Sequence, residues 1–371
     1  MTDRAPVHEL RALTGVRGIA AWFVVFYHIR LSIAGLPIGL RDVFAKGYLA
    51  VDFFFLLSGF VIWLTWSGRI RTGGMTSIPR FLQKRIARIW PLHLVTLGGA
   101  VALALVLGAT GRSDPQFVFS ELPLHILLLQ NWGFTRHLAW NDPAWSISAE
   151  LGAYLLFPVL VTAVNWRRLP SVALLAIAGA LFIGLHLAMG APTLGIDIPR
   201  YGLLRCLVEF TTGSIVCALW LRWRDLTWGP VYAALAAVLL AAAWVAGAPE
   251  TLVVPAIFAA TLLLLALTAG KRGNLFELRW THYLGEISYA TYLSHFILWK
   301  AFKLAFVSDA TAVSPAKIGL YLCLVLLSSI ALYHLIERPA QRLLNRLPSR
   351  SREGLGRGGH KGQRPFPSPN P

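Results

Sequence analysis

The sequence predicts an all-α polytopic membrane protein, a transmembrane helix bundle of about ten spanning helices with both termini in the cytoplasm. Three observations lead to this fold class. The mean hydropathy is +0.60, and only 14% of the residues are charged, against about a quarter in ordinary soluble domains. Apolar stretches long enough to cross a bilayer follow one another along the chain. Most basic residues lie in alternate loops between these stretches.

The ten expected spans follow from the positions of the apolar stretches, since a crossing helix takes about 20 residues. A shorter apolar run, residues 117–132, contains Glu121 and Pro123. We expect it to form a re-entrant or interfacial piece. The spanning helices are expected at residues 14–34, 48–66, 89–108, 145–164, 170–189, 203–221, 229–247, 252–269, 286–306 and 317–336.

The distribution of basic residues orients these spans. With the N-terminus inside, the inside loops and the two termini hold 24 of the 34 Lys and Arg, and the outer parts hold 10. Basic residues gather on the cytoplasmic side, so we expect a multi-pass protein of the inner (plasma) membrane. The same pattern accounts for the net charge of +17 without nucleic acid as a partner. We expect a membrane domain over 1–342 and a disordered, basic cytoplasmic tail over 343–371.

The first span carries two ionisable side chains that a bilayer disfavours. Arg17 and His28 lie within LTGVRGIAAWFVVFYHIRLSIA, residues 13–34. Eleven residues are close to three helical turns, so both side chains share one face, roughly 16 Å apart along the axis. Ionisable groups at membrane depth usually face a bundle interior and serve a function. Alternatively, Arg17 snorkels to the cytoplasmic headgroups and His28 caps the outer end.

A basic cluster precedes the third expected span. The segment RFLQKRIARIWP, residues 80–91, places Arg85 and Arg88 three residues apart, and hence on one helix face. Guanidinium groups form paired hydrogen bonds with phosphate, so a cluster at the cytoplasmic mouth of the bundle suits a phosphorylated ligand. The alternative is that these residues serve topology alone by holding the loop inside.

Two carboxylates enter apolar segments from the expected outer side. Asp52 lies in GYLAVDFFFLLSGFVI and needs a partner, for which Arg17 and His28 are candidates. Glu150 lies about a turn and a half into the fourth span, after Trp145 at the interface. A histidine beside a carboxylate is a general-base pair, because the carboxylate orients the ring and raises its basicity. The structural alternatives are an interfacial cap for Asp52 and a hydrogen-bond partner for Glu150.

Six segments, taken in order, resemble the acyltransferase family 3, the integral membrane O-acyltransferases that modify bacterial polysaccharides and related acceptors. The resemblance covers about residues 9–342. It rests on ELRALTGVRGIAAWFVVFYH, GYLAVDFFFLLSGFVI, RFLQKRIARIWP, PAWSISAE, LGEISYATYLSHF and IERP. It implies an acyl-CoA donor, typically acetyl-CoA, and a hydroxyl acceptor.

The family's motifs fall on residues already singled out. Its signature of an arginine, ten residues and a histidine falls on Arg17 and His28. Its cytoplasmic arginine pair falls on Arg85 and Arg88. Its tryptophan–serine–glutamate element falls on residues of the fourth span, Trp145, Ser146 and Glu150.

The sequence therefore predicts an acyl-CoA-dependent O-acyltransferase that acts on a cell-envelope or exported glycan, or on a glycosylated metabolite. His28 is expected to take the proton from the acceptor hydroxyl as it attacks the thioester. Glu150 is expected to hold the imidazole, and Asp52 can do so instead. The phosphates of the donor are expected at three arginines, Arg17, Arg85 and Arg88.

Several alternatives stay open at this point. A covalent acyl-histidine is chemically possible in place of direct transfer. A proton-coupled transporter or flippase for a lipid-linked sugar or small solute also uses intramembrane ionisable residues. A third interpretation is a non-catalytic membrane subunit, in which His28 is replaceable. No metal is expected, and the acceptor, the acyl chain length and the oligomeric state are left open.

Overall fold

The computed structural model describes residues 10–271 and 273–347, and this part of the chain is helical, without a strand. Ten helices of 17 to 32 residues form a bundle, with four shorter helices between or beside them. The long helices are α1 (Arg11–Ile29), α3 (Ala50–Gly73), α4 (Ile78–Ala109), α6 (Ala144–Ala163), α7 (Ser171–Met189), α8 (Ile198–Trp223), α9 (Gly229–Val245), α10 (Glu250–Thr268), α12 (Ser288–Phe306) and α13 (Pro315–Leu332). The short ones are α2 (Ile38–Ala45), α5 (Leu122–Leu127), α11 (Arg279–Glu286) and α14 (Arg338–Arg346).

The helices are apolar enough for a membrane protein, as expected. Seven helical stretches of the described chain are long and apolar enough to cross a bilayer. One of them, residues 38–109, contains both α3 and α4, and α9 is a further, shorter apolar helix. The prediction of an all-α transmembrane bundle is confirmed, and each expected segment overlaps a long helix. The count of ten spans and the cytoplasmic placement of both termini stay predictions.

The apolar run 117–132 does not form a long helix, in agreement with the expected re-entrant or interfacial piece. Its only α-helical part, α5, has six residues, which is far too short to cross a bilayer. A kinked turn, Gln130–Phe134, follows, with Gly133 at a φ of +87°. The side chains of Gln130 and Asn131 are buried, whereas Phe134 is 64% exposed, so this turn runs from the bundle interior to the surface.

Helices α3 and α8 contact each other backbone to backbone. A Cβ on Gly59 would lie 1.9 Å from the carbonyl oxygen of Phe210, and a Cβ on Gly213 would lie 1.9 Å from that of Leu56. Small residues permit such close approach between helices in membranes, where packing rather than the hydrophobic effect drives association. This contact fixes the helix that carries Asp52 against α8.

A second close contact holds α1 against α11 and the start of α12. A Cβ on Gly18 would lie 2.7 Å from the backbone nitrogen of Gly285, and one on Gly285 would lie 1.8 Å from the carbonyl oxygen of Thr14. Helix α12 begins three residues after Gly285 and runs beside α1. The polar residues of α1 therefore face those of α12.

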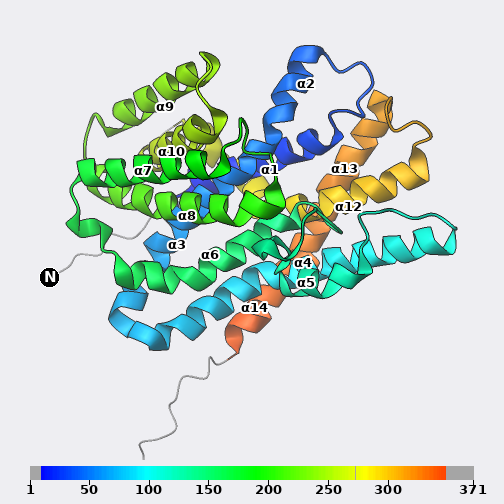
Figure 1. The fold of residues 1–371 in the computed structure, drawn as a ribbon, viewed down its shortest axis with the longest axis horizontal. Helices are drawn as coiled ribbons and strands as arrows, with labels where there is room; N and C mark the ends of the chain where they lie inside the picture. The colour runs from blue at the N-terminus through cyan, green and yellow to red at the C-terminus, as the bar shows by residue number, and fades with distance from the viewer. Residues whose placement is uncertain (1–9, 272, 348–371) are drawn as a thin grey trace, which may run out of the picture.

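The other helices group around this centre. Figure 1 shows α7, α8, α9 and α10 on one side of the bundle and α12 and α13 on another, with α14 against α4. The Arg80 guanidinium donates to the Asn345 carbonyl at 2.8 Å, and the Gln83 amide donates to the Leu344 carbonyl at 2.6 Å. These bonds satisfy carbonyls that a helix end leaves free. Helix α14 continues four residues past 342, and the rest of the basic tail, from 348, lies outside the described residues.

Candidate active site

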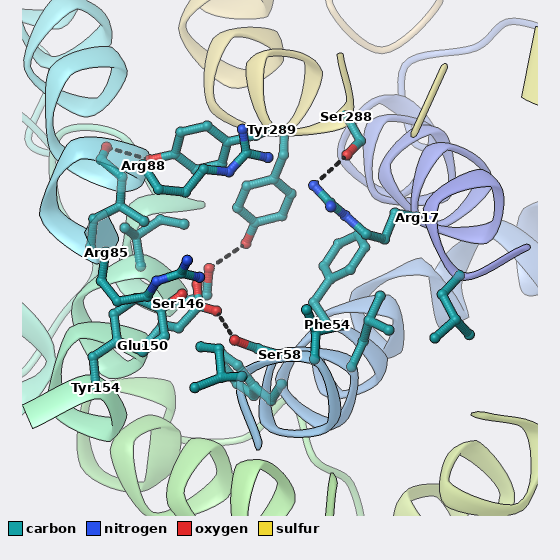
Figure 2. A pocket seen from close by; sticks show the side chains of 18 of the residues that line it. Arg17, Phe54, Ser58, Arg85, Arg88, Ser146, Glu150, Tyr154, Ser288 and Tyr289 are labelled. Carbon is teal, nitrogen blue, oxygen red and sulfur yellow. Dashed lines mark hydrogen bonds between the residues drawn. The ribbon is translucent and has the colours of Figure 1, made fainter. Parts of the chain in front are cut away.

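A cavity of about 380 Å³ lies between α1, α3, α4, α6 and α12. Most of its wall is apolar, and its polar side chains come from all five helices. Figure 2 shows Arg17 entering from α1 on one side and Arg85 and Arg88 entering from α4 on the opposite side. The polar and aromatic residues of the wall are Thr14, Arg17, Phe54, Phe55, Ser58, Thr65, Arg85, Arg88, Ser146, Glu150, Tyr154, Ser288, Tyr289 and Tyr292.

Arg17 faces the bundle interior, as its helical position predicted. Its Nη2 donates to the Ser288 hydroxyl at 3.2 Å, and that hydroxyl donates to the Gly285 carbonyl at 2.7 Å. The backbone contact of Gly18 with Gly285 brings these groups together. The guanidinium therefore lies in the cavity wall and does not extend away from the bundle to headgroups.

Arg85 and Arg88 both line the cavity from one face of α4. Arg85 lies over the Tyr154 ring at 6.0 Å, and its Nε is buried without a hydrogen-bond partner in the described chain. Arg88 lies over the Tyr289 ring at 5.4 Å and forms an ion pair with Glu337. Residues that serve topology alone need only remain on one side of the bilayer. These two side chains point into an internal cavity instead, which favours the ligand-binding interpretation.

Glu337 lies next to the site, as the partner of Arg88, and the sequence did not predict this role. Its side chain is 1% exposed, and its second carboxylate oxygen, Oε2, has no hydrogen-bond partner among the described residues. It lies in the π-helical turn Tyr333–Glu337 that joins α13 to α14. The available signal was an acidic residue at the end of an apolar run, within the IERP segment. Its partner was not visible, because 249 residues separate it from Arg88.

Glu150 also lines the cavity, with a partner that differs from the expected one. The Ser58 hydroxyl of α3 donates to its carboxylate (Figure 2). The expected contact with the His28 imidazole is absent from the described contacts of either residue. The reason is depth along the bundle: Glu150 is level with the arginines, whereas His28 lies at the far end of α1. Glu150 thus belongs to the cavity rather than to the imidazole.

Asp52 is engaged elsewhere. Its carboxylate accepts from Arg205 of α8 through both oxygens, at 2.7 and 2.9 Å from Nη2, and through a third bond of 3.1 Å from Nε. Both side chains are fully buried, and Arg205 also lies over the Trp145 ring at 5.2 Å. The expectation that Asp52 pairs with Arg17 or His28 is wrong in geometry. The close contact of α3 with α8 supplies a nearer cation.

His28 does not line the cavity but lies beyond one end of it. Its Nδ1 is 2.9 Å from the Val24 carbonyl and 3.2 Å from Nε2 of His295 on α12. Between the cavity and this histidine pair stands Tyr292. Its ring lines the cavity and lies 6.2 Å from the His295 ring, and its hydroxyl donates to the Pro143 carbonyl at 3.0 Å. Tyr292 is therefore adjacent to both the arginine-lined cavity and the histidine pair.

This arrangement can bind an anion and, next to it, move a proton. Three guanidinium groups and several hydroxyls face one space, and only one carboxylate, Glu150, is in its wall. Within residues 10–271 and 273–347, no group of three or more His, Cys, Asp or Glu side chains is placed to hold a metal ion. An imidazole with one free nitrogen lies beyond the cavity. The guanidinium groups suit a charged phosphate, and the histidine pair lies next to Tyr292, outside the cavity wall.

Comparison with known proteins gives consistent results along the chain. The family model described as "Acyltransferase domain" matches residues 10–334. The chain is 33% identical over 382 residues to "Acyltransferase MdmB" of Streptomyces mycarofaciens, covering 92% of this chain and 94% of that one. It is 26% identical over 312 residues to "Exopolysaccharide production protein ExoZ" of Rhizobium meliloti (strain 1021), covering 81% and 91%. It is 34% identical over 162 residues to "Protein 2 in picA locus" of Rhizobium radiobacter, covering 40% and 81%. No solved structure matches it.

Proposed function

The chain belongs to the acyltransferase domain family, and on that premise we propose that it transfers an acetyl group from acetyl-CoA to a hydroxyl of an exported or cell-envelope glycan or of a glycosylated metabolite. The relative named for exopolysaccharide production supports a glycan as the acceptor. The family match favours group transfer over the alternatives of a transporter, a flippase or a non-catalytic subunit.

The cavity with its three arginines is the observation that carries the choice of donor. Acetyl-CoA combines several phosphate charges with a long, uncharged arm that ends in the thioester. Arg17, Arg85 and Arg88 are suited to the phosphates, because guanidinium–phosphate hydrogen bonds are charge-assisted and can be bidentate. The apolar wall of the cavity suits the arm that leads from the phosphates toward Tyr292.

His28 is proposed as the general base. Its Nε2 would take the proton of the acceptor hydroxyl while the oxygen attacks the thioester carbonyl. Collapse of the tetrahedral intermediate then breaks the carbon–sulfur bond. CoA leaves as the thiolate, and the proton stays on the His28 imidazolium. An acyl-histidine formed on the same nitrogen would be the covalent alternative. In either route the reacting atoms meet on the His28 side of Tyr292.

The carboxylates take different roles in this proposal. Glu150 would limit the charge repulsion among the arginines of the empty cavity, and it would hold Ser58 of α3. Asp52 would keep the α3–α8 pair together through Arg205. The protein would work in the inner membrane with the arginine-lined end of the bundle toward the cytoplasm, where CoA thioesters are made.

The test uses purified protein in lipid nanodiscs with acetyl-CoA that is radiolabelled on the acetyl group. Label is expected to appear on at least one member of a panel of bacterial exopolysaccharides and simple glycosides, with release of one CoA thiol per ester formed. The Arg85→Ala/Arg88→Ala double variant is expected to lose transfer at the same donor concentration. A protein that neither binds acetyl-CoA nor transfers the label would overturn the choice of donor.

A further inference from the structure

The histidine pair carries an inference beyond the base itself. Two neutral imidazoles in contact need one donor nitrogen and one acceptor nitrogen, and each ring can carry its proton on either nitrogen. The hydrogen-bond partners around His28 and His295 determine which nitrogens carry the protons. They are carbonyl oxygens, which only accept.

Both rings are placed with Nδ1 at a carbonyl. His28 Nδ1 lies 2.9 Å from the Val24 oxygen, and His295 Nδ1 lies 3.1 Å from the Thr291 oxygen. Each carbonyl belongs to the residue four positions earlier on the same helix. A nitrogen lone pair facing a carbonyl oxygen would be repulsive, so the neutral forms of both rings carry hydrogen on Nδ1.

The contact between the rings then has a fixed direction. With its proton on Nδ1, His295 has a lone pair on Nε2, and this atom lies 3.2 Å from His28 Nδ1. The His28 Nδ1–H is therefore shared between the Val24 carbonyl and His295. The remaining nitrogen, His28 Nε2, has its lone pair free and makes no hydrogen bond among the described residues.

His295 is itself unsuited to meet a substrate. Its side chain is fully buried, whereas that of His28 is half-buried. Its backbone carbonyl accepts from the Tyr321 hydroxyl at 2.9 Å, which ties this turn of α12 to α13. The His295 ring is fixed and inaccessible, and its lone pair faces His28. It is therefore placed to act on the His28 imidazole and not on a substrate.

We infer that His295 is a positioning residue for His28, an inference that rests on the function proposed above. By accepting from Nδ1–H it keeps the His28 proton on that nitrogen and directs Nε2 toward the acceptor hydroxyl. When His28 becomes an imidazolium during transfer, its Nδ1–H becomes a stronger donor, and the bond to His295 strengthens with it. A carboxylate could also accept this hydrogen bond, but placing its charge at this apolar position would cost free energy. A neutral imidazole accepts the bond without that cost.

Two substitutions separate a positioning role from a catalytic one. His295→Gln keeps an acceptor oxygen near the place of Nε2, whereas His295→Met keeps the volume and removes the acceptor. We expect His295→Met to lower kcat roughly 10-fold to 100-fold, the range for a lost hydrogen bond to a charged group, with KM for acetyl-CoA unchanged. His295→Gln is expected to recover most of the loss. His186→Met, which alters a histidine bonded to Thr251 between α7 and α10, is the matched control.

A double-variant cycle tests whether the effect passes through His28. In a His28→Ala background, His295→Met is expected to cause no further loss, because residues that act as a unit are strongly non-additive. A His295→Gln variant as inactive as His295→Met, or a full further loss in the His28→Ala background, would overturn the inference. A His28→Ala variant with wild-type turnover would instead refute the proposed base.

A spectroscopic measurement decides the hydrogen bond without activity. Solid-state NMR of protein labelled with ¹⁵N-histidine is expected to show a correlation between the protonated Nδ1 of one ring and the unprotonated Nε2 of a different ring, lost in both His28→Ala and His295→Met. If the wild-type protein turns over no acyl donor, the proposed function fails while this correlation still reports the pair. Absence of the correlation in the wild type overturns the inference in every case.

Discussion

Arg88, in the wall of the cavity, forms an ion pair with Glu337, although 249 positions of the sequence separate the two residues. The carboxylate is buried and the guanidinium is half-buried, so neither group is well solvated. A ligand phosphate that reaches Arg88 would thus meet a guanidinium that is already fixed in direction. The pair connects the arginine-lined cavity to the junction of α13 and α14.

This pair predicts a stability effect that the ligand can offset. Glu337→Ala leaves a partly buried guanidinium without its partner, which costs up to about 3–5 kcal/mol for a buried pair. We expect a lower unfolding temperature in nanodiscs, and a larger upward shift on adding acetyl-CoA than in the wild type. The Arg88→Ala/Glu337→Ala double variant should be more stable than Glu337→Ala. A double variant less stable than both single variants would contradict the ion-pair argument.

We expect the two cavity arginines of α4 to contribute to the affinity for acetyl-CoA. Arg85→Ala and Arg88→Ala should each weaken acetyl-CoA binding by roughly 10-fold or more, since a hydrogen bond to a charged group contributes about 1.5–3 kcal/mol. Lysine replacements should recover only part, because an ammonium cannot form the paired bonds of a guanidinium. Isothermal titration measures the affinity. Arg112→Ala, in the exposed loop after α4, is the control. If the Arg85→Ala/Arg88→Ala variant binds acetyl-CoA as tightly as the wild type, these two arginines serve membrane topology alone.

Replacement of the proposed base should separate binding from turnover. His28 lies outside the cavity wall, so His28→Ala should retain acetyl-CoA affinity while the transfer rate falls by about 10²–10⁴-fold, the usual contribution of a general base. The measurement is single-turnover transfer of labelled acetyl. His137→Ala, in an exposed loop, is expected to behave as the wild type. Near-normal turnover in His28→Ala would show that the base is another group.

Glu150 should act on the donor rather than on the imidazole. Its carboxylate faces the same cavity as the arginines, so Glu150→Gln removes a negative charge that opposes phosphate binding. We expect the Kd for acetyl-CoA to fall several-fold and the pH profile of transfer to stay unchanged. Asp309→Asn, on an exposed loop, is the control. A shifted pH profile in Glu150→Gln would restore the carboxylate–histidine pair that the sequence predicted.

The orientation of the bundle can be tested by cysteine labelling of intact cells. Met75 lies in the turn between α3 and α4 and is 85% exposed, and we expect a cysteine there to be protected from an impermeant reagent. A cysteine at Ser113, in the exposed loop after α4, should react. Native Cys323 is exposed and is first replaced by serine. Labelling of Met75→Cys from outside would contradict the proposed cytoplasmic face.

The sequence was sufficient to predict features that depend on one helix at a time. The apolar stretches predicted the long helices, and the spacing of Arg85 and Arg88 predicted their common face. The eleven residues from Arg17 to His28 correctly indicated that both face inward. Helix ends were less predictable, because α4 begins at Ile78 and continues through the basic segment that was expected to be a loop.

The partners of the charged residues were not predictable, because they depend on contacts between helices. Asp52 pairs with Arg205 because of the close approach of α3 and α8, and nothing in either segment alone specifies this contact. Glu150 was expected at His28 because both occur in the outer half of the predicted spans. Glu150 instead lies level with the arginines, whereas His28 is about three helical turns further along α1 than Arg17, and the carboxylate contacts Ser58.

The contact between Gly18 and Gly285 has a consequence for how this protein tolerates variation. The separation of His28 from His295 depends on α1 and α11, which meet where both lack a side chain, because α12 begins only three residues after Gly285. Even a methyl group there would push α1 from α11 and from the start of α12, and so pull the imidazoles apart. Mutational scanning should therefore find these glycines as intolerant as the histidines, although neither has a functional group. In such a scan these glycines would look like residues that take part in the reaction. Their contribution is only that they lack a side chain, which lets the helices meet.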